Sequence, residues 1–322
     1  MMRFFRYCRH GKLSLTVMLV FTLMTLASCK RIPLYRPESD VYLKLKIFFK
    51  TKADIVEPEQ IRVCFYDADT HQKTNEALLP LEGGFIDIPA GVYDVIAYSM
   101  ANQVTKVDGL ETRATLRAYT KENGVMMKVT KSDGSGTDNV TVYNEPDDLY
   151  TGKLEGIVIP VHSHEDKTLV IEMDMESIVD TWHLEVRHVQ GIQNIAKTQA
   201  YVTGLTPAKY AWDYRTPNRE SAIPFPVKAE VDNSCLKATF NIFGRCPSPG
   251  VESWLNLIVT DTAGNQYLWV FKVTDQFDNP DNTEHLIIID DDAMVIPDNP
   301  GDVGGFSPIV DEWGTIIIPI DV

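Results

Sequence analysis

The feature that most constrains the fold of this chain is an alternation of apolar and polar residues with a period of two. In the stretch VYLKLKIFF (41–49) every odd-numbered residue is apolar, whereas Lys44 and Lys46 occupy even positions. Successive side chains of a β-strand point to opposite faces of a sheet, so this stretch is predicted to be a strand with one buried face. The same alternation returns along most of the chain, and it predicts an all-β protein.

The first group of predicted strands lies in residues 40–161. IRVCFYD (61–67) continues the alternation, and GFIDIPAGVYDVIAYS (84–99) is predicted to form two strands joined by a tight turn at Pro89-Ala90-Gly91. A loop rich in Gly, Ser and Asp follows at 130–139. Short strands separated by turn signals at this spacing are typical of a β-sandwich.

A second β-sandwich is predicted for residues 162–300, after the polar stretch HSHEDK (162–167) that marks the expected domain boundary. Two domains of this size agree with the chain length. The strand-like stretches of this half, in chain order, are TLVIEMDM, WHLEVRHVQGI, TQAYVTGL, LKATFNIF, WLNLIVTD, QYLWVFKV and EHLIIID.

The last 22 residues (301–322) differ from the rest, because Gly and Pro dominate their first part and predict an extended linker. The segment TIIIPIDV (315–322) then ends the chain as an apolar, strand-like stretch. Two interpretations are open: this strand closes the second sandwich, or it is exchanged with a neighbouring subunit, since sheet edges accept added strands. In the second case the candidate donor residues are Thr315, Ile316, Ile317, Ile318 and Ile320.

The first 28 residues have the organisation of a secretory signal peptide. Residues 1–12 contain four basic residues and no acidic residue, and LSLTVMLVFTLMTL (13–26) is almost wholly apolar. That run is shorter than the roughly 20 residues a membrane-spanning helix needs. It is also apolar all round, whereas a helix of a soluble domain has one apolar stripe.

The boundary Leu26-Ala27-Ser28-Cys29 resembles the lipobox of bacterial lipoproteins. The resemblance implies that Cys29 is lipidated on sulfur, becomes the new N-terminus and carries acyl chains such as palmitate. No other cofactor is expected. Residues 29–39 would then form a lipidated tether, kept extended by Pro33 and Pro37.

Removal of residues 1–28 leaves 26 basic and 45 acidic residues, a formal charge of −19. Such a surface repels nucleic acid, so a nucleic-acid partner is not expected. It suits a soluble body that is held off an anionic membrane by a tether.

Cysteine pairing is not predicted within the second half of the chain, although export permits disulfides. Cys235 and Cys246 flank the strand-like stretch LKATFNIF (236–243). A strand of that length holds its ends about 20 Å or more apart, whereas bridged Cα atoms lie about 5.5 Å apart.

The candidate metal ligands are His162 and His164, with Asp166 or Glu165 completing the site. Residues two apart on a strand share one face, so both imidazoles could meet one ion. The alternative is a polar loop between domains. The acidic run at 290–292 is a weaker cation candidate, because calcium loops space their carboxylates around a glycine.

No catalytic motif supports an enzyme: the chain has no Gly-x-Ser-x-Gly elbow and no phosphate-binding glycine loop before a helix. Aromatic residues are numerous, and on β-sandwiches they are usually core or edge residues. A surface glycan-binding lipoprotein with aromatic platforms is the alternative function. The tryptophans available for such a platform are Trp182, Trp212, Trp254, Trp269 and Trp313.

Several motifs in this order resemble the fimbrillin-like lipoproteins of Bacteroidetes, in particular the fimbrial anchor and assembly proteins and their uncharacterised relatives. The motifs are the lipobox cysteine, IPAGVYDVIAY (88–98), YNEPDDLYTG (143–152), VDTWHLEVRHVQGIQNIAKTQAYVTGL (179–205) and VDEWGTIIIPIDV (310–322). The resemblance implies two tandem transthyretin-like Greek-key β-sandwich domains and a non-enzymatic role.

The same resemblance implies an outer-membrane lipoprotein that anchors or assembles a fimbria-like surface structure, with fimbrial or fimbrillin-like subunits as partners. Subunits of the wider family give and receive donor strands. The cell surface is the expected location. Because Lys30 and Arg31 follow Cys29 where such surface lipoproteins tend to carry acidic residues, a periplasm-facing orientation is the alternative.

One further short resemblance concerns Asp261-Thr262-Ala263, which is similar to the O-glycosylation motif of that phylum. It implies that Thr262 is a sugar acceptor. The alternative is a simple turn between two strands, for which these residue types are also suited.

Overall fold

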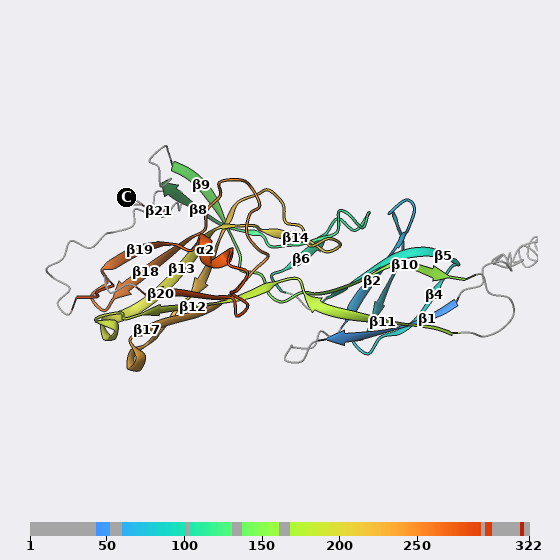
Figure 1. Cartoon of the computed structure of the whole chain (residues 1–322), viewed down its shortest axis with the longest axis horizontal. Helices are drawn as coiled ribbons and strands as arrows, with labels where there is room; N and C mark the ends of the chain where they lie inside the picture. Colours follow the sequence, from blue (N-terminus) through green and yellow to red (C-terminus); the bar gives the residue numbers. More distant parts are fainter. Residues whose placement is uncertain are drawn as a thin grey trace, which may run out of the picture. The chain divides into compact units, whose positions relative to one another are not determined.

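The computed structural model describes residues 43–51, 60–100, 103–130, 137–160, 168–290, 294–297 and 316–318 (Figure 1). The regular secondary structure of the described residues is almost wholly strand, so the all-β prediction is confirmed. Helical structure within these residues is limited to single turns, such as α2 (Thr274–Phe277). None of the described helices has the length and apolar character needed to cross a bilayer.

The first half of the chain forms two groups of strands that are joined where β10 and β11 pair over two residues. In one group β1 lies between β4 (antiparallel) and β11 (parallel), and in the other the order is β3-β2-β5-β10. The bounds are Leu43–Thr51 (β1), Ile61–Asp67 (β2), Lys73–Leu79 (β3), Gly84–Ile88 (β4), Gly91–Ser99 (β5), Tyr150–Ile159 (β10) and Thr168–Ser177 (β11).

A hydrophobic core lies between these two groups, and it follows from the alternation in the sequence. Ile61, Val63 and Phe65 on β2 are fully buried in this core, and Cys64 and Tyr66 on the opposite face of the strand are buried in a second cluster. Met173 and Met175 on β11 face the first core from the other group. Two sheets packed through one interdigitated core are the arrangement of a sandwich.

The second half forms a four-stranded sheet, β16-β17-β12-β20, and a longer sheet that begins β19-β18-β13-β15. Their shared core includes Phe225 and Phe240, whose rings stack with centroids 4.1 Å apart. The bounds are Asp180–Arg187 (β12), Ile195–Leu205 (β13), Ser221–Pro226 (β15), Lys228–Glu230 (β16), Cys235–Ile242 (β17), Trp254–Asp261 (β18), Gln266–Lys272 (β19) and Leu286–Asp290 (β20).

The longer sheet is extended by strands distant in sequence. β9 (Thr137–Tyr143) joins β15 through one parallel pair, Ala222 with Val142, and β8 (Glu122–Thr130) pairs with β9. β21 (Ile316–Ile318) follows β8. A separate small sheet has the order β14-β7-β6, with bounds Ala208–Tyr210 (β14), Arg117–Tyr119 (β7) and Lys106–Asp108 (β6).

Two segments pair across the predicted boundary at residue 162. β11, from the predicted second domain, pairs with β1 and β10 of the first half. The hairpin β8–β9, from the predicted first domain, extends the sheet of the second half. The tandem, transthyretin-like, Greek-key arrangement and the five predicted segments stay predictions.

The turn in IPAGVYDVIAY has a clear local cause. The hydroxyl of Tyr93 donates a hydrogen bond to the carbonyl of Pro89 (3.1 Å), which closes the turn between β4 and β5. The ring of Tyr93 lies against Gly91, where a Cβ atom would meet it at 3.0 Å. A side chain at residue 91 would force this ring to move by a few tenths of an ångström, so glycine fits the Gly-x-Tyr spacing without such a shift.

Candidate functional site

Most residues predicted to carry function lie outside the described part of the chain. This holds for the lipidation candidate Cys29 and for the metal candidates His162, His164 and Asp166. Among the described residues no group of His, Cys, Asp or Glu side chains is placed to hold a metal ion. The lipid and metal assignments therefore stay predictions.

The predicted donor segment is described only at Ile316–Ile318, which forms β21; Thr315 and Ile320 lie outside the described residues. β21 runs parallel to β8, with Cα partners Ile316–Met127, Ile317–Lys128 and Ile318–Val129. These three residue pairs place β21 at one edge of the long sheet (Figure 1).

Thr262 lies at the tip of the β18–β19 hairpin and is exposed. The Asp261 carboxylate accepts hydrogen bonds from the backbone amides of Ala263 (2.9 Å) and Asn265 (2.8 Å), and from the Tyr267 hydroxyl (3.0 Å). The backbone amide of Thr262 donates to the Asn194 carbonyl at 2.8 Å. The turn is thus fixed while the threonine side chain stays accessible, which is compatible with both interpretations of this motif.

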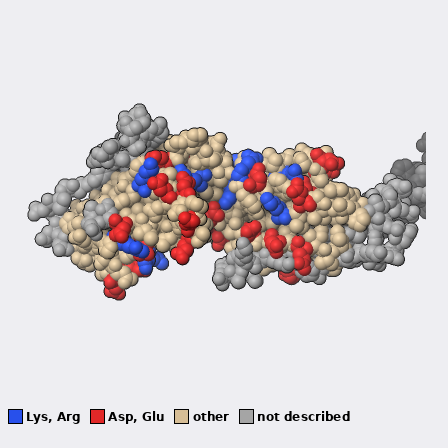
Figure 2. All heavy atoms as spheres, in the orientation of Figure 1, with Lys and Arg blue, Asp and Glu red and all other residues tan. Residues whose placement is uncertain are grey.

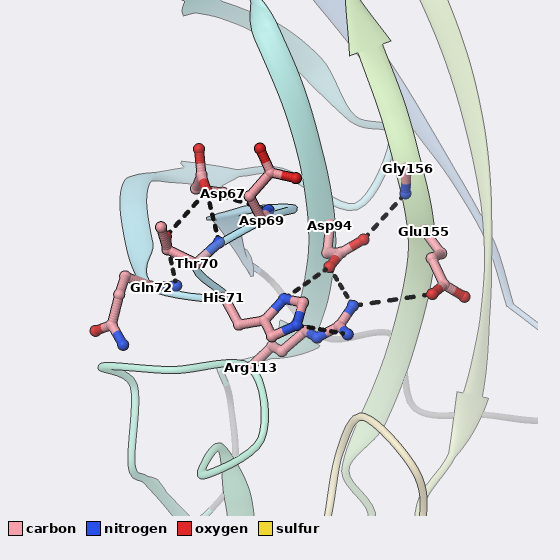
Figure 3. A network of polar contacts seen from close by, with 9 residues as sticks. All are labelled: Asp67, Asp69, Thr70, His71, Gln72, Asp94, Arg113, Glu155 and Gly156. Atoms are coloured by element: carbon pink, nitrogen blue, oxygen red, sulfur yellow. Dashed lines mark hydrogen bonds and ion pairs between the residues drawn. The ribbon is translucent and has the colours of Figure 1, made fainter.

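A buried ion pair that the sequence analysis missed lies on the first half of the chain (Figure 3). Asp94, on β5, is 1% exposed, and it pairs with the guanidinium of Arg113. His71 Nδ1 lies 3.8 Å from the same carboxylate. The other carboxylate oxygen accepts the backbone amide of Gly156 at 3.0 Å, beside the irregularity in β10 between Leu154 and Ile157.

Arg113 also connects this network to an aromatic ring. Its Cζ lies 4.4 Å from the centre of the Trp212 ring, and its Nη2 lies 3.3 Å from His71 Nε2. The Arg113 guanidinium therefore contacts the Trp212 ring through a cation–π interaction and Asp94 and His71 through polar contacts. A charged residue within the apolar strand GVYDVIAYS was the sequence signal that could have found this pair.

The tryptophans do not form an exposed platform among the described residues. Trp182 is buried and stacks on His285 with ring centroids 4.8 Å apart. Trp212 lies under Arg113, and Trp269 packs beside Tyr267. Trp254 is half-buried. This arrangement gives the glycan-binding alternative no support.

The segment YNEPDDLYTG, which contributed to the family resemblance, forms hydrogen bonds with the loop that follows β5. The carboxylate of Asp147 accepts hydrogen bonds from three successive backbone amides, those of Gln103 (2.7 Å), Val104 (3.0 Å) and Thr105 (2.6 Å). Two residues earlier, Glu145 accepts the backbone amide of Asn241 at 2.9 Å. The acidic residues of this motif therefore have structural roles.

Asp147 is expected to make the stability of the chain depend on pH. Burial opposes its charge, but hydrogen bonds from Thr105, Val104 and Gln103 outweigh burial and lower its pKa. A folded-state pKa below the unfolded value stabilises the fold above about pH 4 and ceases to do so as the pH falls through the folded-state pKa. Substitution D147N should cost about 1 to 2 kcal/mol at pH 7, and this cost should shrink as the pH falls through the folded-state pKa of Asp147.

The measurement is the urea midpoint of the wild-type chain and of D147N at a series of pH values. Asp232→Asn, a change at an exposed carboxylate elsewhere in the chain, serves as the control. A difference between wild type and D147N that does not shrink toward low pH would contradict the assigned role of the carboxylate.

A shallow groove of about 520 Å3 crosses the sheet β16-β17-β12-β20. His183 Nδ1 lies 3.0 Å from Thr239 Oγ1 within it. Its charged residues include Glu185, paired with Arg187 (2.8 Å), and Lys237, paired with Glu230 (2.8 Å). Figure 2 likewise shows acidic and basic residues interspersed over the visible face. This mixture of paired charges points to no single class of ligand.

The described cysteines are all free and buried, namely Cys64, Cys235 and Cys246. The prediction that Cys235 and Cys246 are not bridged is confirmed, because the strand β17 separates them. Burial raises the pKa of the Cys64 thiol to about 11. Such a thiol is protonated at neutral pH and is inert as a nucleophile.

These observations define an all-β protein whose described strands form packed sheets with several open edges. Residues 28–225 match the family described as "Domain of unknown function (DUF5119)", so the chain belongs to that family. The predicted resemblance to the fimbrillin-like proteins of Bacteroidetes and their relatives of unknown function is confirmed.

One curated relative is Fim4B of Bacteroides ovatus, which has a provisional assignment as a fimbrium anchoring subunit. The two sequences are 26% identical over 205 residues, which cover 62% of this chain and 55% of Fim4B. The chain thus matches little more than half of the length of that relative.

One solved structure with the same fold is that of a candidate adhesin from Bacteroides ovatus. It is 21% identical in sequence, with a TM-score of 0.57, and the alignment covers 77% of this chain and 93% of the adhesin chain. At this identity the likeness establishes the shared fold.

Proposed function

We propose that this protein is an outer-membrane lipoprotein that anchors or helps to assemble a fimbria-like surface structure. In this proposal Cys29 carries the lipid, the cell surface is the location, and the terminal strand joins the protein to a fimbrial subunit by β-strand complementation. The protein acts as a structural component and not as an enzyme. The provisional assignment of Fim4B as a fimbrium anchoring subunit supports this role.

The observation that carries the proposal is the position of the terminal strand. β21 pairs with β8 through three described residue pairs at the edge of a sheet. Exchange of this strand would cost few backbone hydrogen bonds in the donor and would gain new ones in the acceptor. Its isoleucines supply apolar side chains that a groove between two sheets can bury.

The proposal predicts that a ladder of fimbrial subunits co-purifies with this protein from detergent-solubilised membranes. Deletion of residues 306–322 should abolish this association, because the donor strand is removed. Replacement of residues 306–314 by a Gly/Ser segment of equal length is the matched control and should preserve it, because the strand is retained.

Two results would count against the proposal. If no subunit ladder co-purifies with the wild-type protein, the anchoring role is wrong. If the ladder persists after deletion of 306–322, the role stands but the terminal strand is not the donor.

A further inference from the structure

Strand β19 is a described edge strand with a largely apolar sequence, QYLWVFK. Its first six residues are each half-buried, although five of them are aromatic or aliphatic. On the neighbouring strand β18, the residues opposite Trp269 and Phe271 (Leu257 and Leu255) are 0% exposed. The exposure of β19 therefore follows from its position, because β18 covers one side only.

Three other described edges, those of β20, β3 and β16, carry protection that β19 lacks. The edge of β20 is occupied by two side-chain amides: Gln276 bonds both the amide and the carbonyl of Ile288 (2.8 and 3.0 Å). Asn282 does the same for Leu286 (3.0 and 2.9 Å). These carboxamides satisfy the backbone groups that a further strand would use, and so they close that edge.

Charges protect two more edges. β3 carries Lys73 and Glu76, which form an ion pair at 2.8 Å. β16 carries Lys228 and Glu230 within its three residues. Charged residues on an edge discourage the addition of another strand. In β19 the only charged residue is Lys272, at the end of the strand, where it pairs with Glu252.

The hydrogen-bond phase of β19 shows which backbone groups point to the open side. The backbone amide of Asp261 donates a hydrogen bond to the carbonyl of Asn265 (2.9 Å). The backbone amide of Val273 donates one to the carbonyl of Ser253 (2.9 Å). In an antiparallel pair such bonded positions alternate, so odd-numbered residues of β19 bond to β18. Leu268 and Val270 therefore direct their amides and carbonyls away from the sheet.

The sequence of β19 is complementary to itself in the antiparallel direction. Pairing two copies about Trp269 places Leu268 opposite Val270 of the partner, and Tyr267 opposite Phe271. Gln266 then lies opposite Lys272, so no like charges face each other. The two copies of Lys272 would be about 20 Å apart, beyond the screening length at physiological salt.

We propose that β19 is the interface of a homodimer, in which two copies of this chain pair their β19 strands across a two-fold axis at Trp269. Residues Leu268 and Val270 supply the hydrogen bonds between the copies, and the two long sheets become continuous. Because one strand pair buries less area than a standard interface, the expected dissociation constant is micromolar. This interface is separate from the strand β21 invoked in the proposed function.

Cysteine cross-linking of the full chain in detergent tests the register. At the two-fold axis the Cα atoms of residue 269 would be about 4.5 Å apart, so W269C should form a disulfide-linked dimer. Y267C, an aromatic-to-cysteine change on the same face, is the matched control. Its cysteines would lie about 14 Å apart and should not cross-link above the wild-type background.

Sedimentation of the full chain between about 1 and 200 µM, the range for a weak interface, tests the association without altering the core. L268P removes one outward amide per copy but leaves the bonds to β18, and it should weaken the dimer about 30-fold. L268A, which keeps the amide, should leave the association within about threefold of wild type. Circular dichroism confirms that each variant is folded.

The proposal is overturned if the wild-type chain is monomeric throughout this range, or if folded W269C and Y267C cross-link equally. It is also overturned if deletion of residues 306–322 abolishes the dimer, because the dimer would then depend on this C-terminal segment and not on pairing of the two β19 strands. A dimer that survives this deletion supports the proposal whatever the fate of the fimbrial association.

Discussion

Replacement of Arg113 by methionine is expected to destabilise the fold by about 3 to 5 kcal/mol, the usual cost of leaving a buried charge without its partner. Asp94 is 1% exposed, and without Arg113 its carboxylate keeps only the Gly156 amide and His71 nearby. The measurement is the free energy of unfolding in urea. A second change, D94N, removes the stranded charge, so the double variant should be more stable than R113M alone.

Arg117 offers a matched control within the same region of the chain. It forms an ion pair with Asp108 (2.8 Å) in which both side chains are 39% exposed. Exposed pairs contribute about 1 kcal/mol or less, so R117M should have a small effect. Equal losses in R113M and R117M would show that burial of Asp94 is not the source of the effect.

Replacement of Cys29 by alanine is expected to abolish acylation completely. The motif Leu26-Ala27-Ser28-Cys29 predicts a single lipidated residue, and its sulfur is the only atom that could carry the thioether. Buried acyl chains contribute about 0.8 kcal/mol per methylene, so the anchor depends on them. The measurements are incorporation of labelled palmitate and the mass of the N-terminal peptide.

Cys8 provides the control for this prediction, because it lies in the segment that is expected to be removed. C8A should label as the wild type does, and the mature chain should begin at residue 29 in both. Label retained in C29A, or a mature chain that still contains residues 1–28, would rule out lipidation at this position.

If both the lipid anchor and the β19 pairing are correct, they would reinforce each other. A micromolar interface is weak for a dilute soluble protein. Confinement to a membrane surface raises the effective concentration of the second copy. Dimerisation in the bilayer would then exceed that of the detergent-solubilised chain.

The sequence predicted the strands well wherever one face of the strand is buried. Ile61, Val63 and Phe65 alternate in the sequence, and in the structure they are fully buried. The same reasoning predicted that Cys235 and Cys246 form no disulfide with each other, because a strand of known length lies between them. It also marked Pro89-Ala90-Gly91 as a turn, which the Tyr93 hydroxyl closes.

The functional details were predicted less completely, because they depend on partners distant in the sequence. Asp94 and Arg113 are 19 residues apart, and neither residue by itself indicates an ion pair. The Asp147 carboxylate receives amides 42 to 44 residues away. Alternation within one strand contains no information about which distant loop will cover its outer face.

The sequence by itself determined the all-β class, the positions of many strands and turns, and the family resemblance, because these depend on local periodicity and short motifs. Only the tertiary structure decided which strands are neighbours. It paired β1 with β11 and β12 with β20 in parallel, and extended the long sheet with β8 and β9. It also decided which edges are closed, because the amides of Gln276 and Asn282 reach β20 only after the chain has folded.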